Sequence, residues 1–297
     1  MFSTNFIIFD LEFNSVKIPD TDKHINEIIE IGAVKLDSNL NEIGSFNSTV
    51  KPQFSKKLNS YVKKLTHIQE KELLNAKPFE VVISKFIDWC NIDDNTVFLT
   101  WSDTDLHVLV ENYSEILKRE KVDFIKKYTD LQKYIQTFIK TENNNQISLK
   151  AAADFYKIDT DNFSLHRAED DSRVCGKILS LSFNENIFKE YIRSVDENDF
   201  YKRLMFKPYT ISDLKAEGID KNKLYFDCPI CSAKVKFSGK YNPKIKAFSN
   251  IIKCDNCKKK IAVSFRFRKT FEKITVSKRT REYVKKKKRT YNSTADN

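Results

Sequence analysis

The sequence predicts an α/β domain in which helices pack on a mixed sheet, followed by a small β-rich domain that holds a metal. Two observations predict this division. In residues 1–200, strand-like runs come first and then alternate with helical patterns, an order typical of one α/β domain. Residues 201–297 instead contain two Cys-x-x-Cys pairs among short apolar-polar alternations. At 297 residues the chain is long enough for both domains.

The strands of the first domain are predicted from runs of β-branched and aromatic residues. They begin with the apolar run 6–9, which leads into Asp10 and Glu12, and continue with residues 28–36, 45–50 and 96–100. A polar loop is expected to follow the first strand up to about residue 26. The turn signal at residues 39–41 predicts an antiparallel meander. Glu30 lies within an apolar run and is expected to be paired or at an edge.

The helices are predicted from apolar residues that recur with a period of 3.6. Pro78 opens the first of them, because proline is favoured in the first turn of a helix. Further helical patterns occupy residues 105–118, 130–139, 148–156 and 167–183. Ser148 has the side chain of an N-cap. Helices that alternate with strands in this way are expected to cover the sheet.

Charge is distributed unevenly along the chain. Residues 201–297 contain 27 Lys and Arg against 8 Asp and Glu, a net charge of +19, which leaves −8 on residues 1–200. This asymmetry predicts a polyanionic partner held by the basic part and processed by the acidic part. A solvated lysine-rich surface is the alternative. The basic run 285–289 also has the composition of a nuclear import signal in a eukaryote.

No apolar stretch approaches the length of a membrane span, and the first residues lack the basic and apolar segments of a secretory signal. The sequence therefore predicts a cytoplasmic protein with no membrane partner. The cysteines agree, because paired Cys-x-x-Cys motifs in a reducing compartment indicate metal binding more than disulfides.

Acidic residues recur at positions that suit a metal-dependent nuclease. Asp10 and Glu12 are two residues apart on one strand, so their side chains face the same side. Two carboxylates at the end of a buried strand repel each other and lose hydration unless a divalent cation neutralises them. Oxygen ligands favour Mg²⁺ or Mn²⁺. Asp105 follows a later strand, and Asp171 lies in the second turn of a predicted helix.

Phosphodiester hydrolysis needs an activated water and stabilisation of charge on the phosphate and the leaving group, which two carboxylate-bound cations supply. Asp10 is best placed to bridge both cations. Glu12 and Asp171 would complete the site of the water-activating cation, and Asp105 would hold the second. His166, five residues before Asp171, is the candidate general base, because an imidazole accepts a proton near neutral pH.

Three segments carry a family resemblance: Phe-Asp-Leu-Glu-Phe at 9–13, Ser-Asp-Thr-Asp-Leu at 102–106 and His-Arg-Ala-Glu-Asp-Asp at 166–171. In this order they resemble the three motifs of the DEDDh 3′-5′ exonucleases, which have a ribonuclease H-like fold. The resemblance covers residues 5–182 and includes Leu-Thr-His-Ile at 65–68. It implies the same metal ligands and the same histidine base, with release of nucleoside 5′-monophosphates from a 3′ end.

Some positions remain open within this resemblance. Phe13 stands where the proofreading type has Thr, so the sequence is closer to the RNA-trimming and sporulation-associated branches, with a slight preference for RNA. Asp103 competes with Asp105, and Asp170 with Asp171. The leucine that follows Asp105 begins the helical face, and the family places the aspartate five residues after the histidine, so we choose Asp105 and Asp171.

The two cysteine pairs, Cys228 with Cys231 and Cys254 with Cys257, are separated by 22 residues. Each short turn presents two thiolates to one tetrahedral Zn²⁺, and the segment between them can form the hairpin of a zinc ribbon. The pairs resemble zinc ribbons, and the alternative of a redox motif is disfavoured because such motifs occur singly. We therefore expect a structural zinc.

The chain is thus expected to contain an exonuclease domain at 1–200, a zinc-ribbon domain at 201–278 and a basic, disordered tail at 279–297. Alternating aromatic and basic residues at 265–268 and 240–241 suit single-stranded nucleic acid, or else fill a small core. The ribbon is alternatively a docking module for protein machinery. The competing function is a nucleic-acid-binding protein that retains the fold without turnover.

Overall fold

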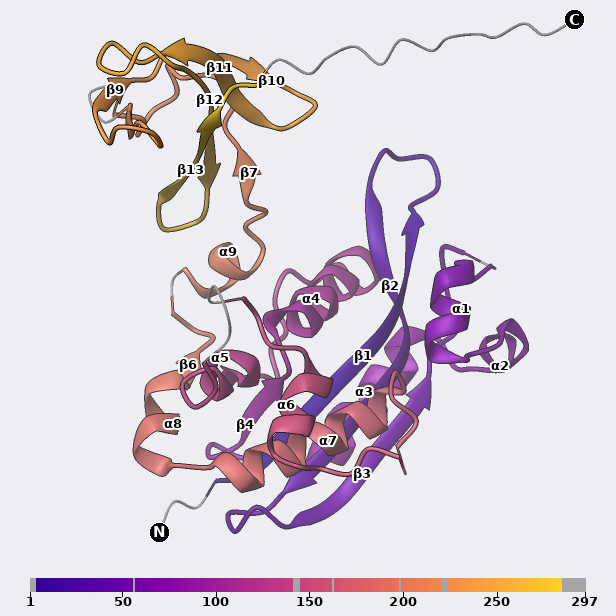
Figure 1. Ribbon diagram of the computed structural model, residues 1–297. Helices are drawn as coiled ribbons and strands as arrows, with labels where there is room; N and C mark the ends of the chain where they lie inside the picture. Colours follow the sequence, from indigo (N-terminus) through magenta and orange to yellow (C-terminus); the bar gives the residue numbers. More distant parts are fainter. Residues whose placement is uncertain are drawn as a thin grey trace, which may run out of the picture. The chain divides into compact units, whose positions relative to one another are not determined.

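The computed structural model describes residues 4–55, 57–140, 145–161, 163–197, 199–220 and 224–284. The chain divides into two compact units, Met1–Met205 and Phe206–Asn297 (Figure 1). Each unit has a sheet and a hydrophobic core of its own.

The first unit is built on a six-stranded mixed sheet with the order β3-β2-β1-β4-β5-β6. Its strands are β1 (Phe6–Lys17), β2 (His24–Leu36), β3 (Glu42–Thr49), β4 (Val97–Thr100), β5 (Lys127–Asp130) and β6 (Arg193–Ser194). Strands β1, β2 and β3 form the predicted antiparallel meander, β4 and β5 continue the sheet in parallel with β1, and β6 is antiparallel to β5. The mixed α/β architecture is therefore confirmed.

Helices cover both faces of this sheet (Figure 1). They are α1 (Ser60–Thr66), α2 (Glu70–Leu74), α3 (Phe79–Cys90), α4 (Asp103–Leu117), α5 (Leu131–Ile135), α6 (Leu149–Phe155), α7 (Ala168–Ser182), α8 (Glu185–Tyr191) and α9 (Phe200–Leu204). Because side chains alternate along a strand, Ile7 and Phe9 of β1 pack with α3 and α4, whereas Phe6 and Ile8 pack with α5, α6 and α7. Ser148 caps α6 as expected.

The expected loop between the first two strands is wrong in part. Strand β1 continues to Lys17 and β2 begins at His24, so the two form a long hairpin past a register shift at Glu12/Phe13. Val16 and Ile25 face each other in this ladder and are buried. The polar composition of residues 14–26 hid the strands, because the ladder hydrogen bonds between two chain segments are not visible in the sequence of either one. Strand β5 and helices α1, α2, α8 and α9 were also not predicted.

The second unit is β-rich, as predicted. Its strands are β7 (Tyr209–Thr210), β8 (Tyr225–Asp227), β9 (Lys234–Lys236), β10 (Lys240–Asn242), β11 (Ala247–Lys253), β12 (Lys260–Lys269) and β13 (Ile274–Glu282). Strands β10 to β13 form an antiparallel sheet in chain order, with β7 paired to β12, and β8 and β9 form a separate hairpin. Alternate residues of β12, from Ile261 to Phe267, are buried in the core of this unit.

The expected start of a disordered tail at Arg279 is wrong, because β13 continues to Glu282 and is paired with β12 along its whole length. Basic composition concealed this strand, whose backbone partners lie on another segment. The basic run 285–289, proposed as a nuclear import signal, lies outside the described residues. Within the described part of the chain, every helix is too short or too polar to cross a membrane.

Candidate functional site

Three carboxyl groups converge on the first unit's sheet. Asp10 and Glu12 lie on the same face of β1, and Asp171 lies in the first turn of α7, which packs across β1 and β2. One oxygen from each of the three carboxyl groups lies within 4.8 Å of the others. Strand alternation and the helix-sheet contact therefore bring together residues that are 161 positions apart.

Asp105 joins the same region from a third element. It lies in the first turn of α4, directly after β4, and is only 7% exposed. Strand β1 pairs with β4 only from Phe6 to Ile8, so the N–H of Leu11 has no partner on that side of the ladder. The Asp105 carboxylate accepts a hydrogen bond from this N–H. Asp105 is thus fastened to the strand that carries Asp10 and Glu12, although it is outside the group of three oxygens.

Asp103 and Asp170, the sequence-based alternatives to Asp105 and Asp171, point away from the site. Asp103 is exposed and forms an ion pair of 3.2 Å with Lys133. Asp170 accepts a hydrogen bond of 2.9 Å from the N–H of Ser164 and lies 3.6 Å from Arg173. The structure therefore places Asp105 and Asp171 toward the site, and Asp103 and Asp170 in surface ion pairs.

The site is strongly electronegative. Burial raises the pKa of Glu12 to about 9, and the negative charges of Asp171 and Glu30 add to the effect. Burial likewise raises the pKa of Asp105 to about 7 and that of Asp171 to about 6. The pKa of Asp10 is also raised by burial and then by the charges of Asp105 and Asp171. Four buried carboxyl groups in one place are a set of ligands that suits a divalent cation, which would stabilise their ionised forms.

One buried atom supports the same conclusion. Asp171 Oδ1 is buried and has no hydrogen-bond partner among the described residues, whereas Oδ2 accepts the N–H of His166 at 3.3 Å. An unpaired buried carboxylate oxygen costs about 1–3 kcal/mol or more. The residues present therefore fit a hard divalent cation, for which carboxylate oxygens are the preferred ligands.

His166 lies in the turn that precedes α7. Its φ of 70° is left-handed, and its N–H donates to Asp171 while the residue itself is exposed. The next residue, Arg167, donates its N–H to Ser164 and closes the turn. The backbone therefore holds His166 against Asp171 at the edge of the carboxyl cluster, with its side chain open to solvent.

Glu30 is the residue that holds this turn in place. It is fully buried on β2, opposite Glu12. The sequence predicted that Glu30 is either paired or at an edge, and it forms an ion pair with Arg167. Arg167 Nε lies 3.0 and 3.1 Å from its two carboxylate oxygens, and Nη2 lies 2.6 Å from Oε1. The N–H of Ala168 donates to Glu30 Oε2 at 3.1 Å. A bidentate buried pair therefore fixes the start of α7 on the sheet.

Gly32 lets α7 approach the sheet. A Cβ on this residue would lie 2.0 Å from the N atom of Glu169 and 2.1 Å from the carbonyl carbon of Ala168. Ser172 also donates to the Gly32 carbonyl at 3.1 Å. Sequence reasoning missed the roles of Gly32 and of the Glu30–Arg167 pair. A glycine and a glutamate inside one apolar strand were the available signals.

The second unit contains four clustered thiols. Cys228, Cys231, Cys254 and Cys257 all place Sγ within 4.8 Å of one another. The Sγ–Sγ distances are 3.7 Å for Cys228–Cys257 and for Cys231–Cys254. Four sulfurs at about 2.3 Å from a tetrahedral zinc are about 3.8 Å apart. The geometry therefore fits a zinc ribbon.

The two cysteine turns have the same backbone design. In the first turn, the N–H of Cys228 donates to the carbonyl of Ala233, and the N–H of Ser232 donates to the carbonyl of Cys228. In the second turn, Cys254 makes the same two bonds with Lys259 and Lys258, and all four distances are 2.9 Å. The residue at the fourth position, Ser232 or Lys258, is left-handed. A hydrogen bond with the Asn256 side chain lowers the pKa of Cys231 to about 6, whereas the pKa of Cys257, although lowered by the Lys259 N–H, is raised to about 12 by burial and the three other thiols.

The alternating aromatics of β12 belong to the core. Phe265 and Phe267 are 0% and 3% exposed, and Phe265 stacks on Phe237 with ring centroids 4.3 Å apart. Of the two interpretations offered by the sequence, the core is therefore correct for these residues, and they have no face free for a base. Tyr241 is partly buried against Phe248.

The family model that matches this chain lies entirely within its first unit. The family model RNase_T, described as an exonuclease, matches residues 7–179. A DNA polymerase III PolC-type from Caldanaerobacter subterraneus subsp. tengcongensis is 27% identical over an alignment of 202 residues that covers 65% of this chain and 12% of that protein. ERI1 exoribonuclease 2 from Xenopus laevis is 24% identical over an alignment of 208 residues that covers 63% of this chain and 30% of that protein. The chain thus spans less than a third of either relative.

Solved structures share the fold of the first unit. A full-length 3′-exonuclease superposes with a TM-score of 0.53 at 20% identity, over 67% of this chain and 93% of that one. The nuclease domain of 3′hExo, a DEDDh family member bound to rAMP, has a TM-score of 0.53 at 21% identity, over 65% of this chain and 96% of that one. Both likenesses show the ribonuclease H-like exonuclease fold.

Proposed function

The chain belongs to the RNase_T exonuclease family, and on this premise we propose that it is a divalent-cation-dependent 3′-5′ exonuclease that releases nucleoside 5′-monophosphates. One observation carries the proposal: Asp10, Glu12 and Asp171 converge within 4.8 Å and leave a buried oxygen of Asp171 without a partner. If these carboxylates had only a structural role, their negative charges would have no counter-charge. Cation-assisted phosphodiester hydrolysis, in contrast, requires converging carboxylates of this kind.

Asp10, Glu12, Asp105 and Asp171 would hold two divalent cations, Mg²⁺ or Mn²⁺, with Asp10 shared between them. When bound, these cations stabilise negative charge on the scissile phosphate and lower the pKa of water. The Asp105 carboxylate is already oriented by the Leu11 N–H, and Asp171 by the His166 N–H. The ligands are therefore held in place before a cation arrives, which reduces the ordering cost of binding.

His166 is the proposed general base. The backbone N–H of His166 is hydrogen-bonded to Asp171, and its side chain is exposed. The imidazole can therefore take a proton from a water at the carboxyl cluster. The pair formed by Glu30 and Arg167 keeps this turn in register with β2. His166→Gln should therefore slow turnover by about 100-fold or more while cation binding persists.

The proposed substrate is the 3′ end of a single-stranded nucleic acid, with a slight preference for RNA. The exoribonuclease relative and the solved 3′hExo domain with rAMP support RNA, as does Phe13 in the first motif. The PolC-type relative supports DNA as an alternative. We further propose a structural Zn²⁺ on the four cysteines and a cytoplasmic location, where thiols remain reduced.

The decisive experiment compares Asp171→Asn with Asp170→Asn in the presence of Mg²⁺, on matched RNA and DNA strands labelled at either end. Asp171→Asn should reduce release of labelled 3′ mononucleotides by about 100-fold or more, because it removes a cation ligand. Asp170→Asn, one residue away but in a surface ion pair, should stay within about threefold. Equal activity of both variants, or products that shorten from the 5′ end, would overturn the assignment.

A further inference from the structure

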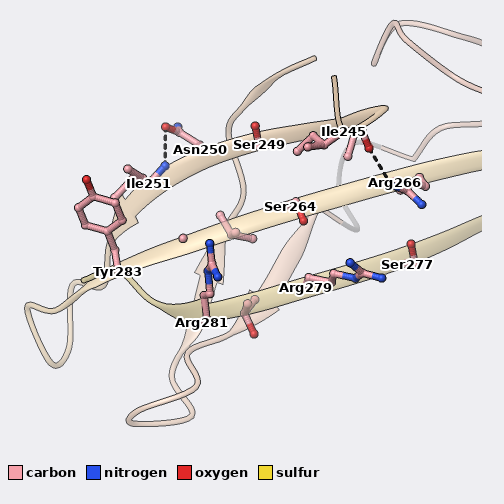
Figure 2. A pocket seen from close by; sticks show the side chains of 14 residues that line it. Ile245, Ser249, Asn250, Ile251, Ser264, Arg266, Ser277, Arg279, Arg281 and Tyr283 are labelled. Carbon is pink, nitrogen blue, oxygen red and sulfur yellow. Dashed lines mark hydrogen bonds between the residues drawn. The ribbon is translucent and has the colours of Figure 1, made fainter. Parts of the chain in front are cut away.

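A groove crosses the open face of the second unit's sheet (Figure 2). It has a volume of about 720 Å³ and is formed by β11, β12 and β13. Ser264 at its centre pairs with Ser249 of β11 and with Arg279 of β13. Paired residues point to the same face of a sheet, so the groove has a floor of small side chains with arginines along β13.

The groove carries positive charge without acidic residues. Its lining contains Arg266, Arg279 and Arg281, and none of the described lining residues is Asp or Glu. Glu282 is adjacent to Arg281 in sequence but points to the opposite face, where its carboxylate lies 3.7 Å from Lys259. An isolated cluster of arginines on one face therefore attracts an anionic partner.

The arginines are available for a ligand. Arg279 and Arg281 are exposed and form no ion pair or hydrogen bond through their side chains with any other described residue. Arg266 donates to the carbonyls of Ile245 and Lys246 at 2.7 and 3.3 Å, so its guanidinium is held at the groove (Figure 2). Two of its five donors are used, and the others remain free to bind phosphate oxygens.

The groove also offers an apolar platform. Tyr283 continues the alternation of Arg279 and Arg281 on the same face and is 38% exposed. Ile251, which is 47% exposed, lies at the same end of the groove (Figure 2). An exposed aromatic ring beside a row of arginines is the combination by which proteins hold single strands, because a base stacks while its phosphates bind cations.

We propose that this groove is a binding surface for single-stranded nucleic acid, with Arg266, Arg279 and Arg281 on phosphates and Tyr283 stacked on an unpaired base. The inference rests on the proposed function for its substrate class. Of the alternating run that the sequence had indicated, it keeps Arg266 for phosphate binding but moves the stacking role to Tyr283, because Phe265 and Phe267 lie on the opposite, buried face.

Charge and stacking together favour a single strand over other occupants. The segment 201–297 has a net charge of +19, which an acidic polymer complements. A duplex keeps its base faces stacked inside, so it would leave Tyr283 without a partner. A protein surface carries charges of both signs, whereas the described lining contains three arginines and no Asp or Glu, which suits a polymer of uniform negative charge better.

The test measures how the 297-residue chain, loaded with zinc and without added Mg²⁺, binds short fluorescent single strands of RNA and DNA. Arg279→Gln/Arg281→Gln should weaken binding by about tenfold and reduce the slope of log affinity against log salt by about 1.4, or about 0.7 per lost phosphate contact. Lys236→Gln/Lys273→Gln removes the same charge from exposed lysines of the same unit that lie outside the groove. This control should change affinity by less than about twofold.

Tyr283 supplies an independent readout. Tyr283→Ala should weaken binding of single strands by about tenfold, Tyr283→Phe should restore it, and neither should change binding of a blunt duplex. If both arginine and lysine double variants lose affinity equally, or if Tyr283→Ala binds like the unaltered protein, the groove is not the binding surface and the proposal is overturned.

The outcome is separable from that of the proposed function. Hydrolysis of a small chromogenic nucleotide ester with Mg²⁺ depends on the carboxyl cluster and needs no long strand. The groove variants should hydrolyse this ester at the unaltered rate, and a lower rate would overturn a role confined to binding. If the unaltered protein does not hydrolyse the ester, the exonuclease assignment is defeated, but the binding result still stands.

Discussion

At the residue scale, the carboxyl groups of the first unit are arranged for ion binding at a cost to stability. Asp10, Glu12, Asp105 and Asp171 all have raised pKa values, and burial is the largest cause in each case. Groups buried in this way favour the protonated form. Without a cation, the folded unit therefore takes up protons that the unfolded chain releases.

The sign of the resulting pH dependence follows directly. The folded pKa values are about 6 for Asp171, 7 for Asp105 and 9 for Glu12, all above their ordinary values. The stability of the metal-free protein should therefore fall as pH rises from about 5 to about 9, because the unfolded state binds fewer protons there. Tm should drop by about 3 °C or more over this range.

Thermal scans of the full chain, with and without Mg²⁺, check this prediction. Added Mg²⁺ should remove most of the fall, since the cation stabilises the ionised carboxylates. The Glu12→Gln variant lacks the carboxyl group whose pKa is raised to about 9 and should show a shallower fall than the unaltered protein. A metal-free Tm that rises over this range would contradict the raised pKa values.

Some residue-scale features were readable from the sequence and others were not. The choice of Asp171 over Asp170 followed from the resemblance to the exonuclease family, which places the aspartate five residues after the histidine, and the structure places Asp171 with Asp10 and Glu12. The Glu30–Arg167 pair was not foreseen because its members are 137 positions apart. Only the packing of α7 on β2 brings these two groups together.

At the scale of elements, the contact between β2 and α7 determines where Asp171 and His166 lie. Gly32 is the closest point of this contact, and a methyl group there would overlap backbone atoms of Ala168 and Glu169. Backbone cannot move aside as a flexible side chain can. The start of α7 would therefore be pushed away from β1 and its carboxylates.

Gly32→Ala should accordingly reduce nuclease activity by about tenfold or more and lower stability by about 1–3 kcal/mol. Gly44→Ala is the matched control on the neighbouring strand β3, since its Cβ would meet only the Trp89 ring at 3.8 Å, an ordinary contact. Activity assays and chemical denaturation of both variants distinguish the two positions. Normal activity of Gly32→Ala would show that α7 tolerates displacement.

The elements with strong periodicity were predicted well. Helix α3 begins after Pro78, and Phe79, Val82, Ile83 and Phe86 are buried as their spacing required. The two short parallel strands differ in this respect. Strand β4 is an apolar run, whereas β5 reads Lys-Tyr-Thr-Asp and has no pattern of its own. Its strand conformation depends on pairing with β4, which a local pattern does not reveal.

At the scale of the whole molecule, the two units use different sources of stability. The first buries two large cores on either side of its sheet. The second has a smaller core that includes the cysteines Cys228 and Cys254, which are 2% and 0% exposed. A metal held by these thiols would supply part of the folding free energy of such a small domain.

Zinc removal should therefore affect the units unequally. Cys231→Ser should release zinc and expose the second unit to proteolysis, while a fragment that ends near residue 205 survives. Cys90→Ala should retain zinc, because Cys90 is buried in the first unit, apart from the cluster. Metal analysis and limited proteolysis, read by mass spectrometry, are the measurements. A Cys231→Ser protein whose second unit remains resistant would show that the fold does not depend on the metal.

The sequence by itself determined the chemistry: which carboxylates, which histidine and which cysteines are present, at spacings typical of metal sites, and the sign of the charge on each part. It also determined the α/β and β-rich classes, because hydrophobic periodicity is local. Tertiary structure alone decided that Glu30 fastens the turn carrying His166, that Phe265 and Phe267 are buried, and that three arginines share one groove. These features depend on pairing between distant segments, and a strand's register and exposed face are set by its partners.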